Sequence, residues 1–145
     1  MHKLGNSSNK KLNTCHQDIQ MIVRTAIALS VIDFGIAEGE RSVEKQQLYF
    51  KAGKSKIDGI NIKGKHNYSP SLAFDIYIFL NGKASWDFNH LCYVAGVLTT
   101  VSQQLYEQGK ISHLLRWGGN WDKDGEIVSD QSFDDLPHFE LYQPI

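Results

Sequence analysis

One stretch, SLAFDIYIF (71–79), constrains the fold most strongly, because its side chains alternate with a period of two. Such alternation is typical of a β-strand, in which successive side chains point to opposite faces of the sheet. One face carries Leu72, Phe74, Ile76 and Ile78, and the other carries Ala73, Asp75, Tyr77 and Phe79. Asp75 is the anomaly, because burying an unpaired carboxylate is costly. Either that face meets water, or a cationic group holds the carboxylate.

Helical periodicity and further alternation surround this strand. Thr14 and Gln17 have the spacing of a capping box, and an apolar stripe at helical spacing follows them, formed by Ile19, Ile22, Val23, Ala26 and Ile27. The remaining predicted elements are a strand at 31–37, a helix at 43–53 capped by Ser42, a tight turn at Asn81-Gly82, a helix from Asp87 to Gly109, and strands at 111–117 and 138–142. Helices around a small, mainly antiparallel sheet predict an α+β fold.

The length of 145 residues suits one domain, which we predict to span 1–145 with residues 1–13 as a polar N-terminal arm. The net charge of −1 gives no reason to expect a nucleic acid or a membrane as partner, and we read the lysine-rich stretch 54–65 as a solvated loop. We also find no apolar segment of transmembrane length and no signal-peptide core, so we expect synthesis in a cytoplasm. Cys15 and Cys92 match no zinc or redox spacing and are predicted to be reduced thiols.

Two of the six histidines lie beside predicted strands and near acids. His66 precedes Asp75, and Asp135 precedes His138 by three residues. Hydrolases commonly hold zinc with three such ligands and keep a spare carboxylate for proton transfer. Spacing alone, however, favours structural histidines at both positions. His2, His16, His90 and His113 are read as tail, helix-surface or strand-end residues.

Four blocks, in this order, carry a resemblance to a known family: GERSVEKQQLYFKAGKS (39–55), GKHNYSPSLAFDI (64–76), LRWGGNW (115–121) and DDLPHFEL (134–141). They resemble the zinc peptidases of peptidoglycan, which include D-alanyl-D-alanine carboxypeptidases and dipeptidases and phage L-alanyl-D-glutamate endopeptidases. The resemblance runs from about residue 14 to the C-terminus. The short chain looks most like a phage endolysin, which implies bacterial peptidoglycan as its partner and a monomer that acts on the cell wall after crossing the membrane.

The resemblance implies a role for each matching residue. His66, Asp75 and His138 would be the zinc ligands, Asp135 the catalytic base, Arg41 the cation that steadies the substrate carbonyl, and Gln46 a residue that orients the site. Trp117 is read as a core residue rather than a wall of the site. A zinc-held Asp75 would explain the carboxylate inside the strand.

The chain departs from the family pattern at three points. Gly64 stands where the family usually has serine, the spacing from His66 to Asp75 is two residues longer than the commonest form, and Asp135 replaces the more general glutamate. The two ligands can still meet if the insertion bulges before the strand. None of these differences removes a predicted ligand.

The acidic segment NWDKDGEIVSDQ (120–131) resembles a degenerate EF-hand loop. Its candidate Ca²⁺ ligands are Asn120, Asp122, Asp124 and Asp130, although Gln131 replaces the usual bidentate glutamate. A solvated Asp/Gly turn is the reading that these departures favour, and a calcium loop is the alternative.

We therefore expect a zinc peptidase that cleaves the stem peptide of peptidoglycan between L-Ala and D-Glu. One alternative is a D-Ala-D-Ala carboxypeptidase or dipeptidase. Another is a non-catalytic zinc module that binds the cell wall, but the sequence offers no fourth histidine or cysteine near the motif blocks to close such a site.

Overall fold

The central strand β2 (Ala73–Leu80) lies inside an antiparallel sheet with the order β1-β2-β5-β4, and β3 pairs with β2 outside this path. The computed structural model describes residues 1–124 and 135–145. Within these residues the other elements are α1 (Asn6–Leu12), α2 (Gln17–Leu29), β1 (Phe34–Glu38), α3 (Val43–Lys51), β3 (Lys83–Ser85), α4 (Phe88–Glu107), β4 (Leu114–Gly118) and β5 (Asp135–Tyr142). The predicted α+β class with an antiparallel sheet is confirmed.

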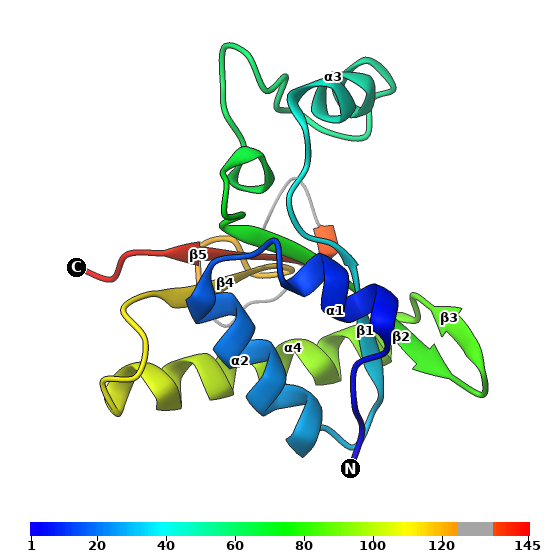
Figure 1. The fold of residues 1–145 in the computed structure, drawn as a ribbon, viewed down its shortest axis with the longest axis vertical. Coiled ribbons are helices and arrows are strands. Elements are labelled where there is room, and N and C mark those ends of the chain that lie inside the picture. Colours follow the sequence, from blue (N-terminus) through cyan, green and yellow to red (C-terminus); the bar gives the residue numbers. More distant parts are fainter. Residues whose placement is uncertain (125–134) are drawn as a thin grey trace.

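The alternation in β2 separates a core face from a polar face. Phe74, Ile76 and Ile78 are fully buried, and Phe74 stacks on Phe139 of β5 with ring centroids 5.3 Å apart. Helices α2 and α4 cover this face, whereas α3 and the segment after it lie on the other side of the sheet (Figure 1). Asp75 therefore points away from the apolar core, toward α3.

Two predicted helix starts have different outcomes. Asp87 caps α4 as predicted, because its side chain accepts hydrogen bonds from the backbone N–H groups of Asn89 and His90. The prediction for Thr14 is wrong: the cap of α2 is His16, whose Nδ1 accepts from the N–H of Asp18. The hydroxyl of Thr14 instead donates to a carbonyl at the end of α1.

The N-terminal segment is more ordered than its polar composition suggested. Residues 6–12 form α1, in which Leu12 is fully buried and Ser8 accepts a hydrogen bond from the N–H of Ile36 in β1. The predicted arm therefore contains a helix that packs on the sheet. Because NSSNKKL has a single large apolar residue, hydrophobic periodicity could not predict this helix.

The predicted turn at Asn81-Gly82 is present, with positive φ angles of 52° and 77°. Both values suit a two-residue hairpin turn, and they lead into β3, a strand that the sequence reading did not identify. Cys15 is buried, Cys92 is partly buried, and both are free thiols, as predicted. Among the described residues, no helix combines the length and apolarity needed to cross a membrane.

Candidate metal and catalytic site

Three predicted ligands from distant parts of the chain meet at one point. His66 lies on a single turn of 3-10 helix (Lys65–Asn67), Asp75 on β2 and His138 on β5. Asp75 and His138 are direct partners in the register of the two strands. Asp75 Oδ1 lies 3.3 Å from His66 Nε2 and 3.2 Å from His138 Nδ1, and the two nitrogens are 3.2 Å apart.

The inserted residues between His66 and Asp75 do not prevent this meeting. Ser71, just before β2, donates its N–H to the carbonyl of Thr14, and the N–H of Leu72 bonds to the carbonyl of Lys65. These bonds hold the extra residues in a bulge before the strand. At Gly64, where the family usually has serine, the backbone N–H donates to the Asn67 side chain.

Each imidazole is oriented by a hydrogen bond from its other nitrogen. His66 Nδ1 lies 2.7 Å from the carbonyl oxygen of Gly39, and His138 Nε2 lies 3.0 Å from a carboxylate oxygen of Glu140. Because both partners only accept, both of these nitrogens carry the proton. When both imidazoles are neutral, as metal binding requires, His66 Nε2 and His138 Nδ1 therefore direct unprotonated lone pairs at each other and at Asp75.

This donor set fits a zinc ion. Ligand atoms about 2.0–2.2 Å from a tetrahedral zinc lie roughly 3.4 Å from one another, close to the three separations found here. Converging lone pairs repel one another unless a cation lies between them. A histidine that binds a metal through one ring nitrogen usually donates a hydrogen bond from the other, as His66 and His138 do here.

The electrostatics of the protein alone likewise favour a cation at this point. Burial would raise the pKa of Asp75, but hydrogen bonds from His138 and His66 hold it well below its usual range. Burial opposes the charged imidazolium of His138, but hydrogen bonds to Asp75 and Glu140 raise its pKa to about 9. In the protein alone the cluster thus retains a proton where a metal ion would fit.

Glu140 and Arg116 are site residues that the sequence reading missed. Arg116 of β4 is the register partner of Glu140 and lies 2.5 Å from its second oxygen. Although burial raises the pKa of Glu140, its bonds to His138 and Arg116 lower it to about 2. The sequence could have indicated Glu140, because residues two apart on a strand share a face and Glu140 follows His138 at that spacing.

Arg41 is held beside the three predicted ligands by two other side chains. Its Nη2 lies 3.5 Å from Asp75 Oδ2, its Nε donates to Glu38 at 2.8 Å, and its Nη1 donates to Gln46 Oε1 at 2.8 Å. Burial raises the pKa of Glu38, but Arg41 and Lys45 lower it overall. Glu38 is a further site residue that the sequence reading did not select.

Gln46 links this arginine to the loop above the site. Its amide donates to Ser55 Oγ at 2.9 Å and to the carbonyl of Ile57 at 2.7 Å. Gln46 is buried on α3, whereas Arg41 lies just before that helix. The contacts are those of a residue that orients Arg41 and the loop.

Asp135 begins β5 and lines the same pocket as the three predicted ligands. Burial raises its pKa; the nearby His138 lowers it and Asp75 raises it further. Its backbone is the register partner of Gly118, where an added Cβ would overlap the carbonyl oxygen of Asp135. The close approach of these strands therefore depends on glycine at that position.

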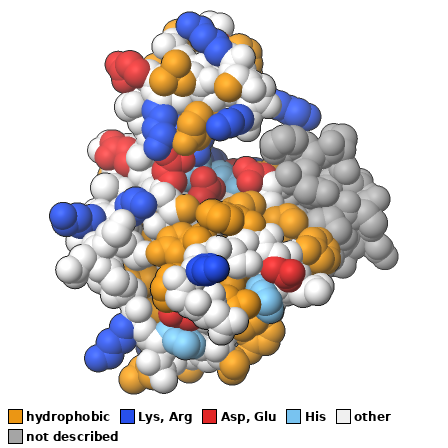
Figure 2. Space-filling view, turned by 90° about the vertical axis from the view of Figure 1, so that its right-hand side faces the viewer, with side chains coloured by type: hydrophobic (Ala, Val, Ile, Leu, Met, Phe, Trp, Pro, Cys, Tyr) orange, Lys and Arg blue, Asp and Glu red, His pale blue; other side chains and the backbone are white. Residues whose placement is uncertain are grey.

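The pocket has a volume of about 550 Å³. Figure 2 shows acidic and histidine side chains gathered in the notch between the upper part of the molecule, with α3, and its main body. The remaining walls include four lysines, Lys54, Lys56, Lys63 and Lys65. The pocket thus places basic groups around an acidic and histidine-rich floor.

The two tryptophans of the WGGNW block differ in role. Trp117 is only 6% exposed, belongs to the core cluster and donates its Nε1–H to the carbonyl of Leu136. The structure therefore places it in the core, as predicted. Trp121 lines the pocket, with its ring centroid 5.5 Å from that of His138.

The predicted calcium loop is described only in its first part. The side-chain oxygens of Asn120 and Asp122 lie 3.2 and 3.3 Å from the N–H of Asp124, as in a turn that side chains stabilise. Asp130 lies outside the described residues. Calcium binding stays a prediction.

Comparisons with known proteins identify the family of the chain. Residues 1–142 match the model of the phage L-alanyl-D-glutamate peptidase family. The chain is 31% identical over 125 residues to an L-alanyl-D-glutamate peptidase of Escherichia phage T5, covering 86% of this chain and 85% of that protein. In fold it is similar to the crystal structure of the Serratia marcescens L-Ala D-Glu endopeptidase ChiX, with a TM-score of 0.75, 22% identity, and coverage of 97% of this chain and 91% of the other. The chain belongs to the phage L-alanyl-D-glutamate peptidase family.

Proposed function

We propose that this protein is a zinc-dependent endopeptidase that cleaves bacterial peptidoglycan between L-alanine and D-glutamate, and that it serves as a monomeric phage endolysin in host lysis. The observation that carries the proposal is the convergence of two oriented imidazoles and one carboxylate in a pocket with a spare acid and an arginine. The choice of the L-alanyl-D-glutamate bond as the one that is cleaved rests on the names of the matching family and of the phage T5 relative.

His66, Asp75 and His138 would hold the ion. When bound, zinc supplies Lewis acidity, which polarises a carbonyl group and makes a water molecule more acidic. Gly39 and Glu140 keep the two imidazoles turned toward the ion.

Asp135 would act as the general base. Its carboxylate takes a proton from the attacking water and passes it to the nitrogen of the leaving amine. The raised pKa of Asp135 suits this role, because a base whose pKa lies nearer neutrality is also a better acid in the second transfer.

Arg41 would stabilise the oxygen of the scissile carbonyl as it gains negative charge. Its hydrogen bonds to Glu38 and Gln46 hold the guanidinium in place before substrate binds, so little reorganisation is needed. The lysines around the pocket would attract the carboxylate groups of a D-glutamate-containing stem peptide.

The direct test is digestion of purified peptidoglycan, followed by mass spectrometry of the fragments. New fragments ending in L-Ala and beginning with D-Glu are expected. Release of single D-Ala residues would instead identify a D-Ala-D-Ala carboxypeptidase. Binding to the wall without any cleavage would favour the non-catalytic module and refute the proposal.

The role of Asp135 is tested by Asp135→Asn, which removes the base and keeps the shape of the side chain. This variant should retain zinc and lose at least about a hundredfold in turnover. Glu107→Gln, which removes a carboxylate at the exposed end of α4, is the matched control and should digest the wall normally. Full activity of Asp135→Asn would refute the assigned base.

A further inference from the structure

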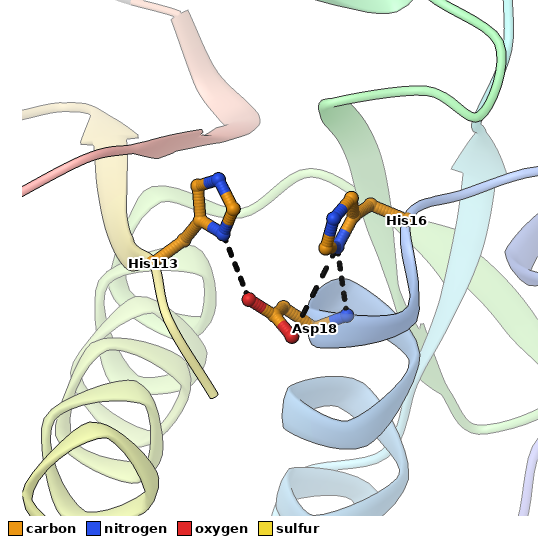
Figure 3. A group of neighbouring side chains, drawn as sticks. All are labelled: His16, Asp18 and His113. Atoms are coloured by element: carbon orange, nitrogen blue, oxygen red, sulfur yellow. Dashed lines mark hydrogen bonds and ion pairs between the residues drawn. The ribbon is translucent and has the colours of Figure 1, made fainter. Parts of the chain in front are cut away.

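A second group of potential metal ligands lies outside the pocket just described. It consists of His16, which caps α2, Asp18 in the first turn of that helix, and His113 in the segment between α4 and β4 (Figure 3). None of the three is among the described residues that line the pocket. His16 and His113 had been expected to be helix-surface and strand-end residues, yet the fold brings them together.

The carboxylate of Asp18 lies between the two imidazoles and offers one oxygen to each. His113 Nδ1 is 2.8 Å from Asp18 Oδ2, and His16 Nδ1 is 4.0 Å from Asp18 Oδ1. The centroids of the two rings are 4.9 Å apart. One donor atom from each residue lies within 4.8 Å of the other two, so small side-chain rotations would bring all three within reach of one ion.

The protonation pattern of the cluster is compatible with a metal. His16 Nδ1 accepts the N–H of Asp18 and so already carries the lone pair that a metal would take over. His113 Nε2 lies 3.0 Å from Gln143 Nε2, an obligate donor, so the ring proton is on Nδ1. On metal binding that proton is released from Nδ1, Nε2 takes up a proton, and the amide of Gln143 turns to present its oxygen.

Charge and exposure also suit an ion. The side chains of His16, Asp18 and His113 are 23%, 7% and 16% exposed, which leaves a path from solvent to a largely enclosed carboxylate. Ser112 holds that carboxylate with hydrogen bonds to Asp18 Oδ2 from its N–H and its hydroxyl, at 3.1 and 3.2 Å. Such prior fixing of a ligand is typical of a site that is formed before the ion arrives.

We propose that His16, Asp18 and His113 form a second binding site for a divalent transition-metal cation of the zinc or nickel type. Two imidazole nitrogens and one carboxylate oxygen are ligands that such ions prefer, whereas calcium and magnesium prefer oxygen alone. Water completes the coordination. The ion links the start of α2 to a residue 95 positions later, just before β4, and therefore stabilises the folded state.

The key variant removes the ligands but keeps their hydrogen bonds. In His16→Asn/His113→Gln, asparagine remains a good helix cap, and the glutamine amide can still donate to Asp18. A matched variant of the pocket, His66→Gln/His138→Gln, removes the other site. Thermal melts in chelator check that both variants fold.

Metal content is then measured after equilibration with micromolar zinc or nickel and removal of free ion. Wild type should bind two equivalents, each double variant one, and the combined variant none. In the pocket variant the metal should also raise the melting temperature, and that rise should vanish in the combined variant. Equal metal content of wild type and His16→Asn/His113→Gln overturns the proposal, and so does a melting temperature of the pocket variant that does not respond to metal.

The test of the second metal site can fail or succeed independently of the proposed peptidase function. Cleavage of peptidoglycan depends on the pocket, whereas the metal content of the pocket variant depends on the second cluster alone. A protein that digests no peptidoglycan can still bind one ion at His16, Asp18 and His113. Conversely, an active peptidase with one equivalent of metal refutes only the second site.

Discussion

At the scale of single residues, a hydrogen bond decides what each histidine can do. His138 can offer Nδ1 to an ion only while Nε2 donates to Glu140, which in turn contacts Arg116. His66 depends in the same way on the carbonyl of Gly39. Gly39 and Glu140, which are not predicted ligands themselves, thus determine whether the two histidines have the tautomer that a metal ion needs.

We predict that Glu140→Gln weakens zinc binding by about 10- to 100-fold, because the amide removes the charge that supports His138 and loosens the contact with Arg116. Competition with a chromogenic chelator measures the change. Glu44→Gln, at an exposed position of α3, should bind zinc normally. Unchanged affinity in Glu140→Gln would show that Glu140 does not support the ligand.

At the scale of elements, the approach of β4 to β5 sets the position of the proposed base. A Cβ at position 118 would meet backbone atoms of Asp135, and backbone cannot move aside as a flexible side chain can. The pairing of these two strands therefore positions the proposed base as well as forming part of the fold.

Gly118→Ala should displace Asp135 and lower turnover by about a hundredfold, the scale expected for a shift of about 1 Å at a reacting group. Zinc content should remain normal, because the predicted ligand on the same strand, His138, lies three residues from this contact and is held by its pairing with Asp75. Steady-state digestion and metal analysis on the same preparation test this. Gly96→Ala, in α4 where a Cβ meets open space, serves as the control.

Helix α1 is a second element whose role can be tested. Leu12 is fully buried in the core cluster, so Leu12→Ala should lower the free energy of unfolding by about 2–5 kcal/mol. Lys10→Ala, at an exposed position of the same helix, should change it by less than about 0.5 kcal/mol. Denaturant unfolding measures both free energies. If α1 were a dispensable arm, the two variants would have equal free energies of unfolding.

At the scale of the whole molecule, paired carboxylates link stability to pH. The pKa is lowered by hydrogen bonds or ion pairs in Asp18, Glu38, Asp58, Asp75 and Glu140. Each of these groups binds a proton less readily in the folded than in the unfolded chain. Their contribution to stability is therefore present above the unfolded pKa of about 4 and lost as the pH falls through the folded pKa, which is about 2 for Glu140.

We therefore predict that the metal-free protein loses melting temperature steadily between about pH 5 and about pH 2. Asp135, whose pKa is raised, makes the folded state more stable as the pH falls, but this single group is outweighed by the five carboxylates whose pKa is lowered. Thermal melts in chelator across this range test the prediction. A melting temperature that stays level down to pH 2 would contradict it.

Local patterns were enough to predict most elements. The alternation around Phe74, the cap at Asp87 and the turn at Asn81-Gly82 each depend on neighbouring residues, which a sequence displays directly. Helix α1 and strand β3 were not predicted, because short polar segments show too little hydrophobic periodicity. The cap at Thr14 was wrong because α1, itself unrecognised, ends there and engages its hydroxyl.

The sequence by itself determined the predicted ligands, the spare acid and the class of fold, since motif blocks and periodicity are properties of a linear chain. Only the tertiary structure decided which nitrogen of each imidazole faces the metal position, that Glu38, Glu140 and Arg116 support the site, and that His16 and His113 meet at Asp18. The physical reason is distance along the chain. His66 and His138 are 72 residues apart, and contacts at such separations depend on strand register and helix packing, which no local pattern records.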